Sequence, residues 1–125
     1  MMGPIIFLSR DEIIEINKSL GYSVLNKGSL DFLDSKLKSV RLTGDERKDV
    51  GKVASILWYE IIRTHPFCDG NKRTAAESTL YFAKINRFRL NMPPNGIIYL
   101  SLKIANSDIS LENLTKEVQG RLEKI

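Results

Sequence analysis

The sequence is poor in the two residue types that most often bind metals or form cross-links. Among 125 residues there is one cysteine, Cys68, and one histidine, His65. A single cysteine excludes an internal disulfide and is typical of a reducing compartment. No histidine or acid spacing around Cys68 suggests a nucleophile or a metal ligand, and we interpret it as a bystander.

Long apolar runs and a strong charge imbalance are also absent. No run is long enough to span a bilayer, and residues 1–8 lack the basic region and cleavage pattern of a signal peptide. We therefore expect a cytoplasmic protein with no membrane partner. The net charge of +4 favours anionic partners such as nucleotides. It is too small to indicate nucleic-acid binding, and no reading helix or aromatic platform is recognisable.

What is present is ordinary for a globular protein, with 42% apolar and 27% charged residues. The length fits one domain over residues 1–125, able to bury roughly two thirds of its unfolded surface. Alternating strand patterns are nearly absent, and almost every segment has helical periodicity. The predicted class is all-α.

The strongest helical pattern lies between residues 50 and 64 and predicts a central, buried helix. Its apolar stripe consists of Val50, Val53, Ala54, Leu57, Trp58, Ile61 and Ile62. Before it, a capping box beginning at Ser9 opens a helix that Gly21 ends, and Ser29 is predicted to cap a second, short helix. The segment from Val40 to Asp49 is the least helical and is predicted to form an ordered loop or a short hairpin.

After residue 70 the pattern predicts three more helices. The first runs from about Asn71 to Asn86. The breaker cluster over residues 91–96 predicts a loop, a second helix follows it, and Ser110 caps the last one. The inner face of the first of these helices is expected to contain Ala76, Leu80 and Ala83, and the spacing of Ile98, Leu102 and Ala105 indicates the second helix.

Residues 65–74 read HPFCDGNKRT and connect the two most strongly helical segments. A helix that starts directly after such a turn points its free backbone N–H groups and its positive dipole end at the loop. This arrangement predicts an anion site, most plausibly for phosphate. Neither G-x-x-x-x-G-K-[ST] nor G-x-G-x-x-G occurs in the chain, so nucleotide chemistry would have to use this loop.

Several loop residues allow two interpretations. His65 can accept a proton at neutral pH, or it can cap the end of the preceding helix. Asp69 can cap the next helix, or it can hold Mg²⁺ together with phosphate oxygens. Gly70 permits a backbone conformation that a side chain would block, and Asn71 can cap the helix or bind a phosphate oxygen.

Lys72 and Arg73 are unfavourably placed for a helix dipole, which prefers negative charge at its N-terminus. A bound polyphosphate would account for both cations, with lysine as a point charge and arginine as a bidentate fork. The alternative is that both side chains point into solvent.

The run from His65 to Ala75 resembles the signature of the Fic/Doc (Fido) superfamily, specifically its Doc, or death-on-curing, branch. Residues 25–35 are similar to a Doc-branch segment before a short helix, and residues 109–114 resemble the start of the last helix. The resemblance implies a compact bundle of six or seven helices, with the active loop between two central helices. It also implies that His65 is the general base and Asp69 holds Mg²⁺. Phosphate binding then falls to Gly70, Asn71, Lys72 and Arg73.

Two departures from the Fic pattern are informative. Enzymes of that branch that transfer AMP usually have a glycine at the position of Lys72 and a second arginine at the position of Ala76. For the Doc branch, the resemblance implies that ATP binds in an inverted orientation, with its γ-phosphate where the AMP-transferring enzymes place the α-phosphate. The γ-phosphate is then transferred to a Ser or Thr hydroxyl of a target protein. The leading hypothesis is therefore an ATP- and Mg²⁺-dependent kinase that acts as a toxin, with a translation elongation factor as a plausible target.

The alternatives are AMP transfer to a protein hydroxyl and a non-catalytic domain that binds phosphate or protein. The inhibitory motif [ST]-x-x-x-E-[GN] of Fic proteins is absent, because Asp108 stands four positions before Glu112. The resemblance instead implies inhibition by a small antitoxin protein. By position and analogy, Arg41, Leu42 and Thr43 are expected to form a flap that docks the target's main chain.

Overall fold

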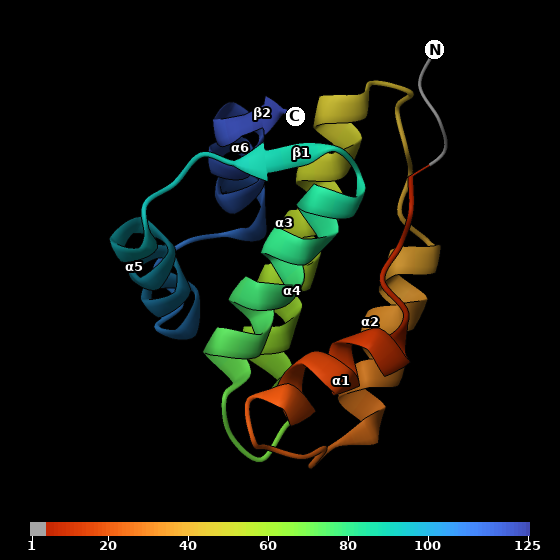
Figure 1. The fold of residues 1–125 in the computed structure, drawn as a ribbon, viewed down its shortest axis with the longest axis vertical. Coiled ribbons are helices and arrows are strands. Elements are labelled where there is room, and N and C mark those ends of the chain that lie inside the picture. Colours follow the sequence, from red (N-terminus) through yellow and green to blue (C-terminus); the bar gives the residue numbers. More distant parts are fainter. Residues whose placement is uncertain (1–4) are drawn as a thin grey trace.

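The computed structural model describes residues 5–125 and confirms the helical class. Within these residues there are six helices and two short strands (Figure 1). In chain order the elements are α1 (Arg10–Ser19), α2 (Lys27–Lys38), α3 (Glu46–Thr64), α4 (Asn71–Ile85), β1 (Phe88–Leu90), α5 (Pro94–Ala105), α6 (Leu111–Arg121) and β2 (Leu122–Lys124).

Helix α3 is the core of the molecule, as its apolar stripe predicts. Every residue of that stripe is at most 1% exposed. The helix packs most extensively against α4 and α6, and α2 and α5 cover other sides of it. Figure 1 shows α3 and α4 side by side along the long axis, joined at one end by the loop of residues 65–70.

The predicted helix starts are correct at Ser9 and Ser110 and wrong at Ser29. Ser9 forms the full capping box with Glu12, and the Ser110 side chain accepts the Asn113 N–H. Helix α2 begins two residues earlier than Ser29, and its N-cap is Asn26. Ser29 lies inside the helix, where its hydroxyl donates to the Thr64 carbonyl at 2.9 Å.

Two segments predicted to be loops are partly helical. In the stretch 40–49 the first six residues form a loop, but Asp45 caps α3 by accepting the Lys48 N–H, so residues 46–49 are helical. In the stretch 91–96, α5 begins at Pro94. Proline suits the first helical position because it has no N–H to leave unpaired there.

Helix α5 is present as predicted, but the inner face of α4 differs from the predicted one. Ala83 is buried, but Ala76 and Leu80 are only half-buried, and Ile98 and Leu102 are exposed. Small polar residues take much of the buried face of α4, which consists of Thr74, Ala75, Ser78, Thr79, Phe82 and Ala83. A pattern search for apolar residues does not detect such a face.

The two strands have no counterpart in the predicted elements. β1 and β2 pair antiparallel, with Phe88 opposite Lys124 and Leu90 opposite Leu122. They join the end of α4 to the end of α6, at the end of the molecule far from the 65–70 loop (Figure 1). Each strand is three residues long, which is too short for a recognisable alternation.

Candidate active site

His65 directly follows α3 and is the first residue of the loop of residues 65–70, which we call the motif loop. It is the C-cap of α3 and adopts a left-handed backbone conformation, with φ 48° and ψ 62°. Left-handed geometry is uncommon for a residue other than glycine, and here it turns the chain sharply out of the helix. The imidazole is exposed and has no hydrogen-bond partner among residues 5–125. The capping interpretation is therefore correct, and the role of His65 as a base stays a prediction.

The loop is held in place from within. Phe67 is 1% exposed and anchors it in the core. The side-chain amide of Asn71 accepts the Phe67 N–H through Oδ1 and donates to the Phe67 carbonyl through Nδ2, each at 3.0 Å. The Asn71 side chain thus neither caps α4 nor is free for phosphate. Its contribution to an anion site is its backbone N–H.

The N-terminus of α4 has no side-chain cap. The N-cap is Gly70, in a left-handed conformation with φ 70°. Asp69 is not the cap, since its Oδ1 accepts the Gly70 N–H at 2.7 Å. The first helical bond runs from the Thr74 N–H to the Gly70 carbonyl. The N–H groups of residues 71–73 therefore remain available to an anion at the positive end of the helix dipole.

The two cations of the motif project from this helix end. Lys72 and Arg73 are both exposed, and neither forms an ion pair within the described part of the chain. Their charges oppose the helix dipole, which disfavours this placement in the absence of an anion. These two cations and the uncapped N–H groups thus place positive charge at the same end of α4.

An apolar cleft extends from these cations along α4 and α5. Its volume is about 540 Å³, within the range of small-molecule sites. Lys72 and Arg73 lie at its border, and Leu80 and Ile97 are among the apolar residues that line it. Ala76 lines it too, which explains why that side chain is not packed in the core. No base-binding pocket was predicted from the sequence, because the lining comes from two helices that only the fold brings together.

A second segment that the sequence analysis missed lies beside the loop. Val24 and Phe67 form an isolated antiparallel bridge, and the Pro66 carbonyl accepts the N–H groups of Leu25 and Asn26, each at 2.9 Å. Residues 22–26 thus run along the motif loop as a short extended strip. The only advance signal was the similarity of residues 25–35 to the Doc branch, which carries no information on this pairing.

Cys68 is exposed on the loop and faces this strip. Its N–H donates to the Ser23 carbonyl at 3.0 Å, and its Sγ lies 3.5 Å from the Ser23 hydroxyl. Hydrogen bonds from the hydroxyl and the backbone of Ser23 lower the pKa of the Cys68 thiol.

The structure does not bring Arg41, Leu42 and Thr43 to the motif loop. They lie before the N-terminus of α3, whereas His65 follows its C-terminus (Figure 1, gold and green). A helix of 19 residues separates its ends by roughly 27 Å. These three residues therefore lie at the end of α3 opposite His65. The extended strip at residues 22–26 occupies the place beside the loop.

The segment around Thr43 is instead organised by a buried carboxylate. Asp49 is 2% exposed and accepts the Thr43 N–H and hydroxyl, each at 2.8 Å, and the Gly44 N–H at 3.0 Å. Burial alone would raise the pKa of Asp49, but these hydrogen bonds and the nearby Lys52 charge outweigh burial and lower it.

Asp69 is the residue of the loop that suits a divalent cation. No group of three or more potential metal ligands occurs in the described residues. Mg²⁺ does not require such a group, since it usually takes one or two carboxylates and completes its shell with phosphate oxygens and water. The exposed Asp69 carboxylate beside an anion site fits that arrangement, in which protein and nucleotide share the ion.

The sequence comparisons bear on this loop directly. A model of the Fic/DOC family matches residues 7–83, a span that includes the loop of residues 65–73 and most of α4. No curated protein matches the chain.

In the described part of the chain, no helix is both long and apolar enough to cross a membrane.

Proposed function

The chain belongs to the Fic/DOC family, whose members modify proteins with nucleotides, and from this premise we propose that it is an ATP-dependent protein kinase. It would transfer the γ-phosphate of ATP to a Ser or Thr hydroxyl of a target protein. The observation that carries the proposal is the uncapped N-terminus of α4, where Lys72 and Arg73 project without an ion pair in the described residues.

The transfer itself needs a base, an anion site and a leaving group. His65 accepts the proton of the target hydroxyl, and the hydroxyl oxygen attacks the γ-phosphorus. The bond from that phosphorus to the bridging oxygen breaks, and ADP leaves with the electron pair. The N–H groups of residues 71–73 and the Lys72 and Arg73 side chains stabilise the equatorial charge, so catalysis comes mainly from positioning and electrostatics. When bound, Mg²⁺ would neutralise phosphate charge, and Asp69 would hold it.

Two residues favour phosphate over AMP transfer. Lys72 adds bulk and charge at the helix end where the AMP-transferring branch usually has glycine. Ala76 provides no second arginine, and its methyl group lines the apolar cleft instead. Both features support a pose in which the γ-phosphate, not the α-phosphate, lies at the N-terminus of α4.

AMP transfer remains the second candidate, because of the cleft between α4 and α5. A nucleoside bound there would have its base against Leu80 and Ile97 and its α-phosphate nearest to Lys72 and Arg73. The two candidates therefore differ in which end of the nucleotide lies in the cleft. A non-catalytic binder is the third possibility, and it would not require His65.

By resemblance to the Doc branch, we further propose that the protein acts in the cytoplasm as the toxin of a toxin–antitoxin pair. Its target would be a translation factor, with an elongation factor the plausible choice, and a small antitoxin protein would inhibit it. Expression of the chain alone should then arrest growth, and His65→Ala should abolish the arrest. Growth that is unaffected by a chain active in vitro would refute the toxin assignment.

A paired labelling experiment tests the reaction. The protein and its His65→Ala variant are incubated with Mg²⁺ and cell lysate, once with ATP labelled on the γ-phosphate and once with ATP labelled on the α-phosphate. We expect a His65-dependent band from the γ label alone, and its mass would identify the target. A band from the α label would establish AMP transfer. If neither label is transferred while ATP still binds, the non-catalytic reading is favoured.

A further inference from the structure

One buried polar side chain from α1 lies beneath the motif loop. Asn17 is 1% exposed, and its Nδ2 donates both to the Asp69 carbonyl at 3.1 Å and to the Thr74 hydroxyl oxygen at 3.0 Å. Asp69 is the last loop residue before the N-cap of α4, and Thr74 closes its first turn. A single amide from another helix thus ties together the two ends of the segment that contains the free N–H groups.

The same residue also fixes the strip beside the loop. The Asn17 carbonyl accepts the N–H groups of Leu20 and Tyr22 at the end of α1. The Tyr22 ring in turn packs against Gly70, so closely that a Cβ at position 70 would lie 2.5 Å from it. Asn17 therefore contacts the motif loop directly through its side chain and indirectly through its backbone.

Stability alone is a poor explanation for an amide at this position. The Oδ1 of Asn17 is buried and has no hydrogen-bond partner among the described residues. A buried polar atom without a partner is costly, and this cost offsets part of what the two hydrogen bonds from Nδ2 contribute to stability. Ile13, one turn earlier on α1, is apolar and equally buried.

We propose that Asn17 is a positioning residue for the active loop. It holds the backbone at Asp69, and with it the direction of the Asp69 carboxylate and of the N–H groups that follow, in the orientation that phosphate and its cation require. The inference rests on the proposed function, because it assigns the phosphate and the cation to that helix end. Groups that hold a metal-binding residue in place, without touching the metal themselves, commonly change metal affinity or activity by roughly 10- to 100-fold when they are removed.

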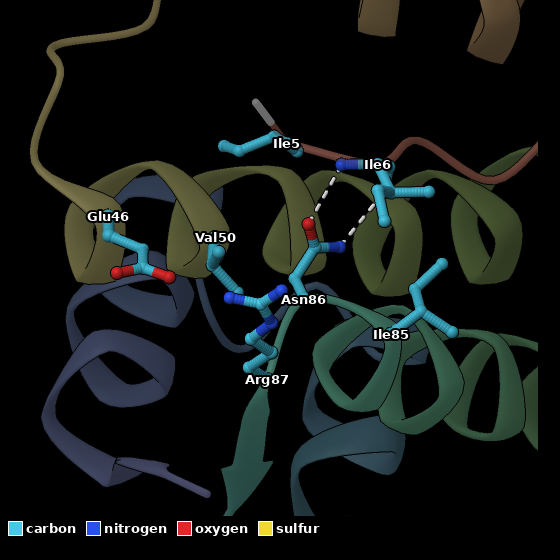
Figure 2. A pocket seen from close by; sticks show the side chains of 7 residues that line it. All are labelled: Ile5, Ile6, Glu46, Val50, Ile85, Asn86 and Arg87. Atoms are coloured by element: carbon cyan, nitrogen blue, oxygen red, sulfur yellow. Dashed lines mark hydrogen bonds between the residues drawn. The ribbon is translucent and has the colours of Figure 1, made fainter. Parts of the chain in front are cut away.

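The chain provides a matched control at the other end of α4. Asn86 is also a buried asparagine, 8% exposed. Its side chain accepts the Ile6 N–H and donates to the Ile6 carbonyl, at 2.8 and 2.9 Å (Figure 2). Asn86→Leu removes three side-chain hydrogen bonds, two to Ile6 and one to the Phe82 carbonyl, whereas Asn17→Leu removes two. The control is thus at least as disruptive, but it acts at the C-cap of α4, far from the motif loop.

The first readout is amide hydrogen exchange by NMR, measured on the protein without nucleotide. We expect Asn17→Leu to reduce protection at Phe67 and Thr74 by roughly tenfold or more relative to the α3 core. Asn86→Leu should leave that ratio unchanged. If Asn17→Leu does not fold, Asn17→Ser replaces it, because its short hydroxyl cannot reach both acceptors.

The second readout is the Mg²⁺ concentration that gives half-maximal transfer. Asn17→Leu should raise it roughly tenfold, with little change in KM for the target protein, and Asn86→Leu should not. Loop protection and Mg²⁺ requirement that both stay as in the wild type would overturn the proposal. If the wild-type chain transfers nothing, the proposed function fails, whereas the exchange result still decides whether Asn17 positions the loop.

Discussion

At the scale of single residues, the site depends on the contact between Gly70 and Tyr22. Gly70 has a φ of 70°, a left-handed conformation that most side chains avoid. The Tyr22 ring occupies the space into which a Cβ would project, with Cδ2 and Cε2 at 2.5 and 2.7 Å from it. Two independent constraints, the backbone and the neighbouring ring, therefore require glycine immediately before the first turn of α4.

We predict that Gly70→Ala destabilises the protein by about 1–3 kcal/mol through left-handed strain, with a further loss from displacement of Tyr22. The free energy of unfolding in urea measures the effect. Gly120→Ala is the matched control, because a Cβ there meets nothing within 4 Å and the residue is helical. It should stabilise by about 0.5–1 kcal/mol. Equal effects of the two substitutions would contradict this account.

At the scale of elements, the start of α3 depends on Asp49. Its carboxylate accepts three hydrogen bonds from the loop before the helix, and the same helix ends at His65. The loop of residues 40–45 is thus ordered by a residue in the first turn of the helix that follows it. It serves the fold at the end of α3 opposite the active loop.

We predict that Asp49→Asn lowers the free energy of unfolding by about 1–3 kcal/mol at neutral pH, because the amide cannot accept all three hydrogen bonds. The folded-state pKa of Asp49 lies below its ordinary value of 3.8. Its ionised form therefore contributes stability that is fully present above pH 3.8 and is lost as the pH falls through the lower folded-state value.

The measurement is urea unfolding of the wild type and Asp49→Asn as a function of pH. The difference between the two should be constant near neutrality and shrink as the solution becomes more acidic than the ordinary pKa. The exposed Asp108 provides the control, and Asp108→Asn should produce little difference at any pH. If the difference in free energy of unfolding between the wild type and Asp49→Asn did not change with pH, the ionised Asp49 carboxylate would not be its cause.

At the scale of the whole molecule, the short β1–β2 pair closes the fold at the end opposite the active loop. It connects α4, whose N-terminus is the proposed phosphate site, to α6, which covers α3. Leu122 is 2% exposed and Phe88 is also 2% exposed. The pair therefore contributes core residues as well as hydrogen bonds.

We predict that Leu122→Ala destabilises the whole molecule by about 2–5 kcal/mol, as expected for a large-to-small change in a core. Ile125→Ala, at a side chain that is 74% exposed, should change stability by no more than about 0.5 kcal/mol. Chemical denaturation checks both variants. Because the pair lies far from His65, Leu122→Ala should leave the specific activity of the folded fraction unchanged.

The sequence by itself determined the helical class and the central position of α3, and it predicted the chemistry of the loop. These features are local. The burial of α3 follows from its periodicity, and the predicted anion site rests on a glycine turn and two cations at the start of a helix. The family follows from the same loop, since the matched span contains it.

Only the tertiary structure decided what surrounds the loop. Asn17, Tyr22 and the strip of residues 22–26 lie roughly 40–60 positions before the residues of the motif loop and of α4 that they contact, and no local pattern encodes such a contact. The cleft between α4 and α5 likewise exists only after two helices have packed. The flap predicted at residues 41–43 lies at the end of α3 opposite His65, as the order of these segments along the chain requires. The residue types and spacings of the loop can be recognised in the sequence, whereas the contacts that hold the loop in place depend on packing between segments far apart in the chain.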